Sequence, residues 1–135
     1  MVKTVTSEEV TAEELGGADT HTQKSSVADG AFDNDLDALA EIRRLVGFLP
    51  AHNDAPLPRL DSGDDPARVI PALDSLVPEN ANTPYDMREL VTSLADAGDF
   101  YELQPHFAKN ILTGFIRMNG FPVGVVANQP MVLAG

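Results

Sequence analysis

Residues 111–127, ILTGFIRMNGFPVGVVA, carry the strongest short-range signal in the chain. Asn119-Gly120 separates two runs that are rich in β-branched and aromatic residues, and a type I′ turn favours this dipeptide because both central residues take positive φ. The stretch therefore predicts a β-hairpin, and residues 99–104 predict a further short strand. A single hairpin is marginal in water, so we expect a larger sheet to cover it.

The clearest helix follows a polar loop at residues 18–32. Residues 33–35 (DND) supply caps and negative charge where a helix begins, and Pro50 ends it. Apolar side chains recur at spacings of three and four along this helix and predict one apolar stripe. The stripe consists of Leu36, Leu39, Ile42, Val46 and Leu49.

A change of composition separates this helix from the next one. Residues 50–71 hold prolines among Asp, Asn and Gly, which predicts an extended connector that buries too little apolar surface to fold alone. Residues 72–83 continue it as irregular chain. A second helix is predicted to begin after Asp86, which forms a cap pair with Glu89, and to run to Gly98.

The amino-terminal region predicts a strand and a short helix. Residues 1–6 alternate apolar and polar side chains, and residues 7–15 read as a helix with a capping box between Thr11 and Glu14. Gly16-Gly17 is interpreted as a left-handed helix end. The strand at 1–6 and the apolar hairpin both lack partners in the pattern, so we expect the chain to be an internal piece of a larger protein.

The composition narrows the class of protein. The 135 residues, 43% of them hydrophobic, suit one ordinary domain with a modest core. A net charge of −12 argues against nucleic acid and anionic membrane surfaces as partners. The absence of cysteine excludes a disulfide framework and a thiolate metal site, and it fits a reducing compartment.

Side chains that could carry catalysis are scarce. His21, His52 and His106 have no second histidine or carboxylate at a zinc-like spacing, so no metal site is predicted. There is no nucleophile elbow, and no residue is predicted to be catalytic. Asn128-Gln129-Pro130 has two interpretations. It is either an ordinary loop start or a place where amides at the end of a buried strand hold a ligand.

Several segments together resemble one family. They are EELGGADTH (13–21), YDMRELV (85–91), GDFYELQPHFAKNILTGF (98–115) and PVGVVANQP (122–130). In this order they resemble the carboxyltransferase (β) subunit of biotin-dependent acyl-CoA carboxylases, the propionyl-CoA carboxylase β chains above all. The resemblance covers nearly the whole chain.

The resemblance implies a fold and a division of the chain. The expected fold class is mixed α/β (α+β), as part of a crotonase-like β-β-α spiral that spans the junction of two halves. Residues 1–55 are expected to end the first half, and residues 56–83 to form the Pro/Asp-rich connector. Residues 84–135 are expected to begin the second, acyl-CoA-binding half.

The resemblance also implies a reaction and its partners. Members move a carboxyl group from carboxybiotin to an acyl-CoA, here from propionyl-CoA to methylmalonyl-CoA. They form a homo-hexameric core, and biotin is carried by a partner α subunit. The implied compartment is the bacterial cytoplasm or the mitochondrial matrix. The family's charge-stabilising glycine turns lie outside these residues, so the isolated chain is expected to be inactive.

Candidate binding residues follow from the matching motifs. The residues on the acyl-CoA side are Asn110, Gly114, Asn128, Gln129 and Pro130, and those on the biotin side are Gly16, Gly17 and His21. The alternative is a stand-alone, non-enzymatic acidic interaction module that docks on a partner through the edge of the hairpin.

Overall fold

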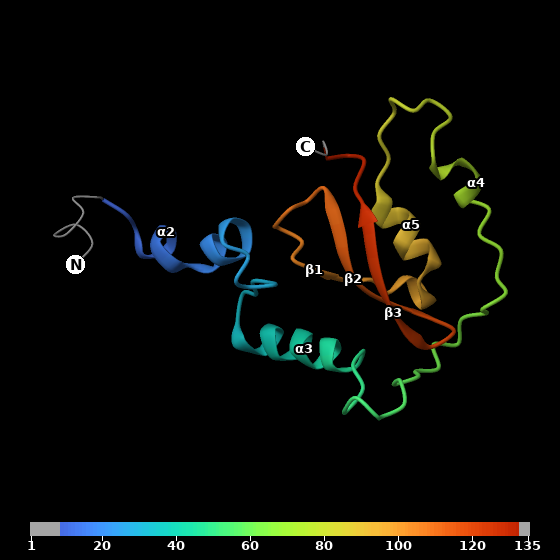
Figure 1. The fold of residues 1–135 in the computed structure, drawn as a ribbon, viewed down its shortest axis with the longest axis horizontal. Coiled ribbons are helices and arrows are strands. Elements are labelled where there is room, and N and C mark those ends of the chain that lie inside the picture. Colours follow the sequence, from blue (N-terminus) through green and yellow to red (C-terminus); the bar gives the residue numbers. More distant parts are fainter. Residues whose placement is uncertain (1–8, 133–135) are drawn as a thin grey trace.

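A three-stranded antiparallel sheet lies at the centre of the computed structural model, which describes residues 9–132. Strands β1 (Tyr101–Leu103), β2 (Ile111–Met118) and β3 (Phe121–Asn128) lie in the order β1-β2-β3 (Figure 1). Asn119 and Gly120 both have positive φ, 51° and 78°. The predicted hairpin and the extra strand are therefore confirmed.

Helix α5 (Met87–Leu94) covers one face of the sheet. Its core contacts are apolar and join the buried residues Val91, Ala95 and Ile116 with Met87, Phe100, Val123 and Val125. The Asp86 side chain caps the helix through the Arg88 amide, so the expected cap pair with Glu89 is wrong. The helix ends before Gly98, because the 3-10 turn η2 (Asp96–Gly98) replaces its predicted last turn.

Helix α3 (Asp35–Val46) lies near the other face of the sheet (Figure 1). Asn34 caps it by accepting a hydrogen bond from the Asp37 amide at 3.0 Å, as expected for this residue type. Phe48, just past its end, is 4% exposed, and its ring lies 5.7 Å from that of Phe115 on β2. The sheet is thus packed between α5 and the end of α3.

The predicted apolar stripe of α3 does not make this contact. Leu36 is 78% exposed and Ile42 is 54% exposed, and Leu39, Val46 and Leu49 are exposed as well. Glu41 and Leu45 of the same helix are half-buried instead, and both line the space between α3 and β1. Within residues 9–132, nothing buries the stripe.

The amino-terminal helix α2 (Ala12–Gly16) has the predicted capping box between Thr11 and Glu14. Gly17 ends it with φ −78°, so the left-handed end that we expected is wrong. The Thr20 hydroxyl donates to the last carbonyls of the helix, which removes the need for a left-handed turn. The π-helix η1 (Thr20–Lys24) lies within the expected loop, and the strand predicted at 1–6 lies outside the described residues.

The connector contains one short helix and is held by polar contacts. Helix α4 (Leu73–Leu76) lies where we predicted irregular chain. The Leu60 amide donates to the Gly120 carbonyl at 3.0 Å, and the Ser62 hydroxyl donates to Asp96 at 3.0 Å. The connector was predicted to bury little apolar surface. It keeps a defined path because hydrogen bonds to the hairpin turn and to η2 hold it.

Candidate functional site

Four of the five residues predicted on the acyl-CoA side meet where the hairpin strands end. We call this group, which consists of Asn110, Asn128, Gln129 and Pro130, the hairpin base. The Gln129 amide donates to the Asn110 carbonyl at 2.8 Å. Asn128 ends β3 opposite Ile111. Strand pairing therefore brings residues 110 and 128–130 together.

Gln129 is the buried member of the hairpin base, with 2% exposure. Its side-chain oxygen accepts from the Met87 amide at 3.2 Å and from the Met131 amide at 3.4 Å. Its side-chain nitrogen donates to Asp86 at 2.6 Å. Its side-chain amide thus fixes the start of α5 through Asp86 and Met87, whereas Asn128 is exposed and Pro130 is half-buried.

Three charged groups that connect the hairpin base, α5 and β1, namely Asp86, Arg88 and Glu102, are paired within the protein. Burial of Asp86 disfavours its charge, but the hydrogen bonds from Gln129 and the Arg88 amide outweigh this, and the pKa of Asp86 lies below its ordinary value. Arg88 makes two hydrogen bonds with Glu102 on β1, at 2.6 and 2.7 Å. The Glu102 carboxylate raises the pKa of Arg88. These groups connect α5 to the sheet.

Gly114, the fifth predicted residue on the acyl-CoA side, is buried inside β2, away from the hairpin base along the strand. It pairs with Glu102 on β1 and with Val125 on β3. A Cβ at this position would overlap the Tyr101 carbonyl oxygen. Close approach of β1 therefore explains why glycine stands here.

The residues predicted on the biotin side lie at the amino-terminal end of the described chain. Gly16 and Gly17 end α2, and His21 in η1 has its Nδ1 3.1 Å from the Ser25 hydroxyl. The Glu13 carboxylate lies over Gly17, where a Cβ would stand. The surface around them is partly exposed, and it is acidic because Glu13, Glu14 and Asp19 lie beside them.

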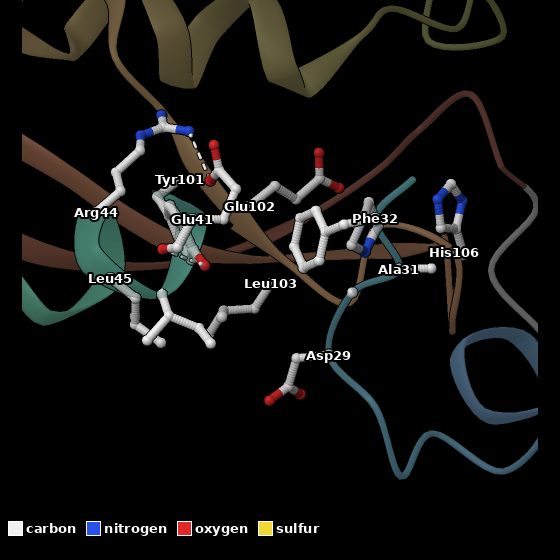
Figure 2. A pocket seen from close by; sticks show the side chains of 13 residues that line it. Asp29, Ala31, Phe32, Glu41, Arg44, Leu45, Tyr101, Glu102, Leu103 and His106 are labelled. Atoms are coloured by element: carbon white, nitrogen blue, oxygen red, sulfur yellow. Dashed lines mark hydrogen bonds and ion pairs between the residues drawn. The ribbon is translucent and has the colours of Figure 1, made fainter. Parts of the chain in front are cut away.

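A cavity of about 250 Å³ lies between α3, β1 and residues 29–32. Figure 2 shows Arg44 and Leu45 on one side and Phe32 and His106 on the other. Arg44 forms ion pairs with Glu41 and Asp99, so its charge is already satisfied. Burial, followed by the Glu41 charge, raises the pKa of Tyr101 beside it.

The sequence did not reveal this cavity, because its walls come from residues 29–45 and from residues 101–106, which are distant along the chain. The spacing of residues within one helix or strand does not predict contacts between such distant segments. Among residues 9–132, no group of three or more His, Asp or Glu residues could hold a metal ion. None of the helices in the same range has the length and hydrophobicity to cross a bilayer.

Comparison with known proteins identifies one family. A model described as the carboxyl transferase domain matches residues 1–135. The chain is 67% identical, over its full length, to the propionyl-CoA carboxylase beta chain of Roseobacter denitrificans, and it covers 26% of that protein. It is 50% identical to the methylmalonyl-CoA decarboxylase subunit alpha of Veillonella parvula, again over its full length and 26% of that protein.

The structure has a similarly close match. A transcarboxylase 12S structure, described as a hexamer with methylmalonyl-coenzyme A and methylmalonic acid bound, aligns with a TM-score of 0.91 at 36% identity. The alignment covers 97% of this chain and 25% of that one. The predicted mixed, crotonase-like carboxyltransferase fold is thereby confirmed. The chain spans about a quarter of the length of the relatives that it matches.

Proposed function

The chain belongs to the carboxyl transferase domain family, and we propose that it is a segment of an enzyme that transfers a carboxyl group from carboxybiotin to an acyl-CoA. The proposed substrate is propionyl-CoA, which becomes methylmalonyl-CoA. The observation that carries this proposal is the 67% identity, over all 135 residues, with a propionyl-CoA carboxylase beta chain. A stand-alone acidic interaction module gives no reason for such a match.

We further propose the division of the chain expected from the sequence. Residues 1–55 end the first half of the carboxyltransferase, residues 56–83 connect, and residues 84–135 begin the second half. The change of composition at the connector supports this division. The second half then begins with the close packing of α5 on the hairpin.

The candidate binding residues keep their proposed sides. We assign Asn110, Gly114, Asn128, Gln129 and Pro130 to the acyl-CoA side, and Gly16, Gly17 and His21 to the biotin side. Clustering at the hairpin base supports the first assignment, with exposed Asn128 as the member that has surface to offer. Gln129 contributes by holding α5 in place.

Biotin is proposed to arrive on a partner subunit, and the parent enzyme is proposed to form a hexameric core. The charged groups described near the hairpin base pair with one another, as Arg88 does with Glu102. The contribution of this chain is therefore to shape and place the two sides of the site. Proton transfer and charge stabilisation are assigned to other parts of the parent enzyme.

A segment replacement tests the proposal. The matching segment of the Roseobacter denitrificans propionyl-CoA carboxylase beta chain is replaced by these 135 residues, and the chimera is assembled with its biotin-carrying partner. We expect carboxylation of propionyl-CoA within about tenfold of the unmodified enzyme, a barrier change of roughly 1.4 kcal/mol or less. The isolated chain is assayed in parallel and is expected to give no turnover.

The matched control is the same chimera with Gly114→Val, which places a side chain against β1 and is expected to abolish turnover. A chimera that assembles fully but does not carboxylate propionyl-CoA would contradict the proposed function. Biotin-dependent turnover by the isolated chain would contradict the assignment of the chemistry to other segments.

A further inference from the structure

One buried arginine joins three segments of the chain that are distant in sequence. We propose that Arg117 is a positioning residue that fixes the end of α3 and the connector against the hairpin. The inference deepens the proposed function and rests on it, because it takes the chain to carry parts of the biotin side and of the acyl-CoA side. A carboxyltransferase must hold its biotin side and its acyl-CoA side at a fixed separation.

The contacts of Arg117 define this junction. The side chain leaves β2 and the residue is 7% exposed. One terminal nitrogen donates to the Pro58 carbonyl at 2.7 Å and to the Gly120 carbonyl at 3.0 Å. The other donates to the Gly47 carbonyl at 2.5 Å. One guanidinium thus bonds the connector, the hairpin turn and the end of α3.

The guanidinium of Arg117 also lies over an aromatic ring. Its central carbon lies 4.8 Å from the centre of the Phe48 ring, a cation–π geometry. Phe48 also packs against Phe115 and Tyr101, from β2 and β1. The same aromatic residue therefore touches both the arginine and the sheet.

A buried cation is costly unless its partners stay in place, so the contacts of Arg117 favour one arrangement of the three segments. Within residues 9–132, no carboxylate forms an ion pair with Arg117, so carbonyl oxygens and the ring must compensate for its lost hydration. Gly47 caps the carboxyl end of α3, where the helix dipole is negative and favours a cation. Displacing α3 or the connector would leave the charge buried without its partners, which is costly.

Arginine suits this position better than lysine does. Its planar fork presents several N–H groups in fixed directions, whereas lysine presents a compact charge at one point. Three carbonyls on three segments match the fork. The connector is also held beside the hairpin by Arg59, which donates to the Asn119 carbonyl at 3.2 Å but makes no contact with α3. Arg59 is exposed, and it therefore serves as the control for an arginine that bonds the hairpin turn without reaching α3.

The consequence concerns the geometry of the proposed site. Gly16, Gly17 and His21 precede α3 in the chain, and the hairpin base belongs to the sheet. Arg117 bonds the end of α3 to the strand that leads into the hairpin turn. It touches neither candidate set, so it acts on the reaction only through their relative placement.

A distance measurement tests the inference without any enzymatic assay. The chain contains no cysteine, so two introduced cysteines carry spin labels at defined places. The pair Arg43→Cys and Val126→Cys joins exposed positions on α3 and β3. The pair Glu89→Cys and Val126→Cys lies within the packed α5–sheet unit and serves as the internal reference.

We expect one narrow distance distribution for the α3–β3 pair in the otherwise unchanged chain. Arg117→Met should broaden or split this distribution and leave the reference pair narrow, whereas Arg59→Met should change neither. The α3–β3 distribution of Arg117→Lys should be broader than that of the unchanged chain and narrower than that of Arg117→Met. An unchanged α3–β3 distribution in Arg117→Met overturns the proposal. Broadening of the reference pair does so too, because it assigns Arg117 to folding of the sheet itself.

Kinetics of the chimera supply the second measurement. Arg117→Met should lower kcat by up to about 100-fold, the order of loss that a small misplacement of reacting groups causes. The KM for propionyl-CoA should stay nearly constant, because the acyl-CoA side itself is intact. A raised KM with unchanged kcat contradicts a positioning role. An inactive chimera that has narrow distances counts against the proposed function alone.

Discussion

The backbone amide of Gly120 donates a 2.6 Å hydrogen bond to the carboxylate of Asp96, inside the turn that joins β2 and β3. The Asn119 amide donates to the other carboxylate oxygen at 3.0 Å, and the Ser62 hydroxyl completes the set. Asp96 is 6% exposed. A residue of η2 therefore holds both central residues of the hairpin turn and the connector.

Replacement of this carboxylate should destabilise the chain. In Asp96→Asn the side chain keeps one acceptor oxygen, while its NH2 group faces N–H donors that it cannot satisfy. The expected loss in free energy of unfolding is about 1–3 kcal/mol, the cost of leaving buried polar groups unpaired. Urea denaturation at pH 7 measures it. The exposed Asp54→Asn is the control, and equal effects of the two substitutions would contradict the prediction.

The same carboxylate should make stability depend on pH. Burial alone would raise the pKa of Asp96, but hydrogen bonds from Gly120, Ser62 and Asn119 outweigh burial, and its pKa lies below its ordinary value. The folded protein therefore binds this proton less tightly than the unfolded chain. The stabilisation is complete at pH values above the pKa of Asp96 in the unfolded chain. It disappears as pH falls through the lower pKa of Asp96 in the folded protein.

Unfolding midpoints in urea between pH 7 and pH 3 test this dependence. The difference between the unchanged chain and Asp96→Asn should be largest near neutral pH and should shrink in acid. Asp86, whose pKa is also lowered, is present in both proteins and cancels in the comparison. A difference that stays constant or grows in acid would show that the carboxylate charge is not responsible.

The two strand glycines should respond differently to alanine. In Gly114→Ala the added Cβ meets the Tyr101 carbonyl oxygen and the Phe100 ring, and we expect a loss of about 1–3 kcal/mol from overpacking. In Gly124→Ala it meets nothing within 4 Å, and we expect a change within about 0.5 kcal/mol. Thermal unfolding compares them. Similar losses at both positions would mean that β1 does not approach Gly114 closely.

Two residues of the hairpin base should respond differently to substitution, because Gln129 is buried and Asn128 is exposed. Gln129→Met removes the bonds to Asp86 and the Met87 amide, with an expected loss of about 1–3 kcal/mol. Hydrogen exchange at the Met87 amide should quicken as well. Asn128→Ala, at an exposed position, should change stability by less than about 0.5 kcal/mol. Unchanged exchange at Met87 in Gln129→Met would contradict the helix-holding role.

Features that depend on near neighbours in the chain were predictable. The Asn119-Gly120 turn, the Thr11–Glu14 capping box and the Asn34 cap each involve residues no more than three positions apart. The wrong prediction of a left-handed helix end at Gly17 has a local cause as well. Gly17 is extended because a threonine hydroxyl already serves the end of α2.

The candidate site was predictable only in part. Strand pairing, which the hairpin pattern implies, brings Asn110 to Gln129. The burial of Gln129 was not predictable, since its partners Asp86 and Met87 lie more than 40 residues earlier in the chain. The cavity beside Tyr101 has the same origin.

The sequence by itself determined the hairpin, the starts of α3 and α5, and the family, because turn chemistry, capping and motif order are properties of short or ordered stretches of chain. Only the tertiary structure decided which side of α3 is buried. The aliphatic stripe has the right periodicity, yet Phe48 enters the interior because aromatic and cationic partners from β1 and β2 meet it there. A periodic pattern reports that a helix has two faces, but burial depends on which surface the folded chain brings against it.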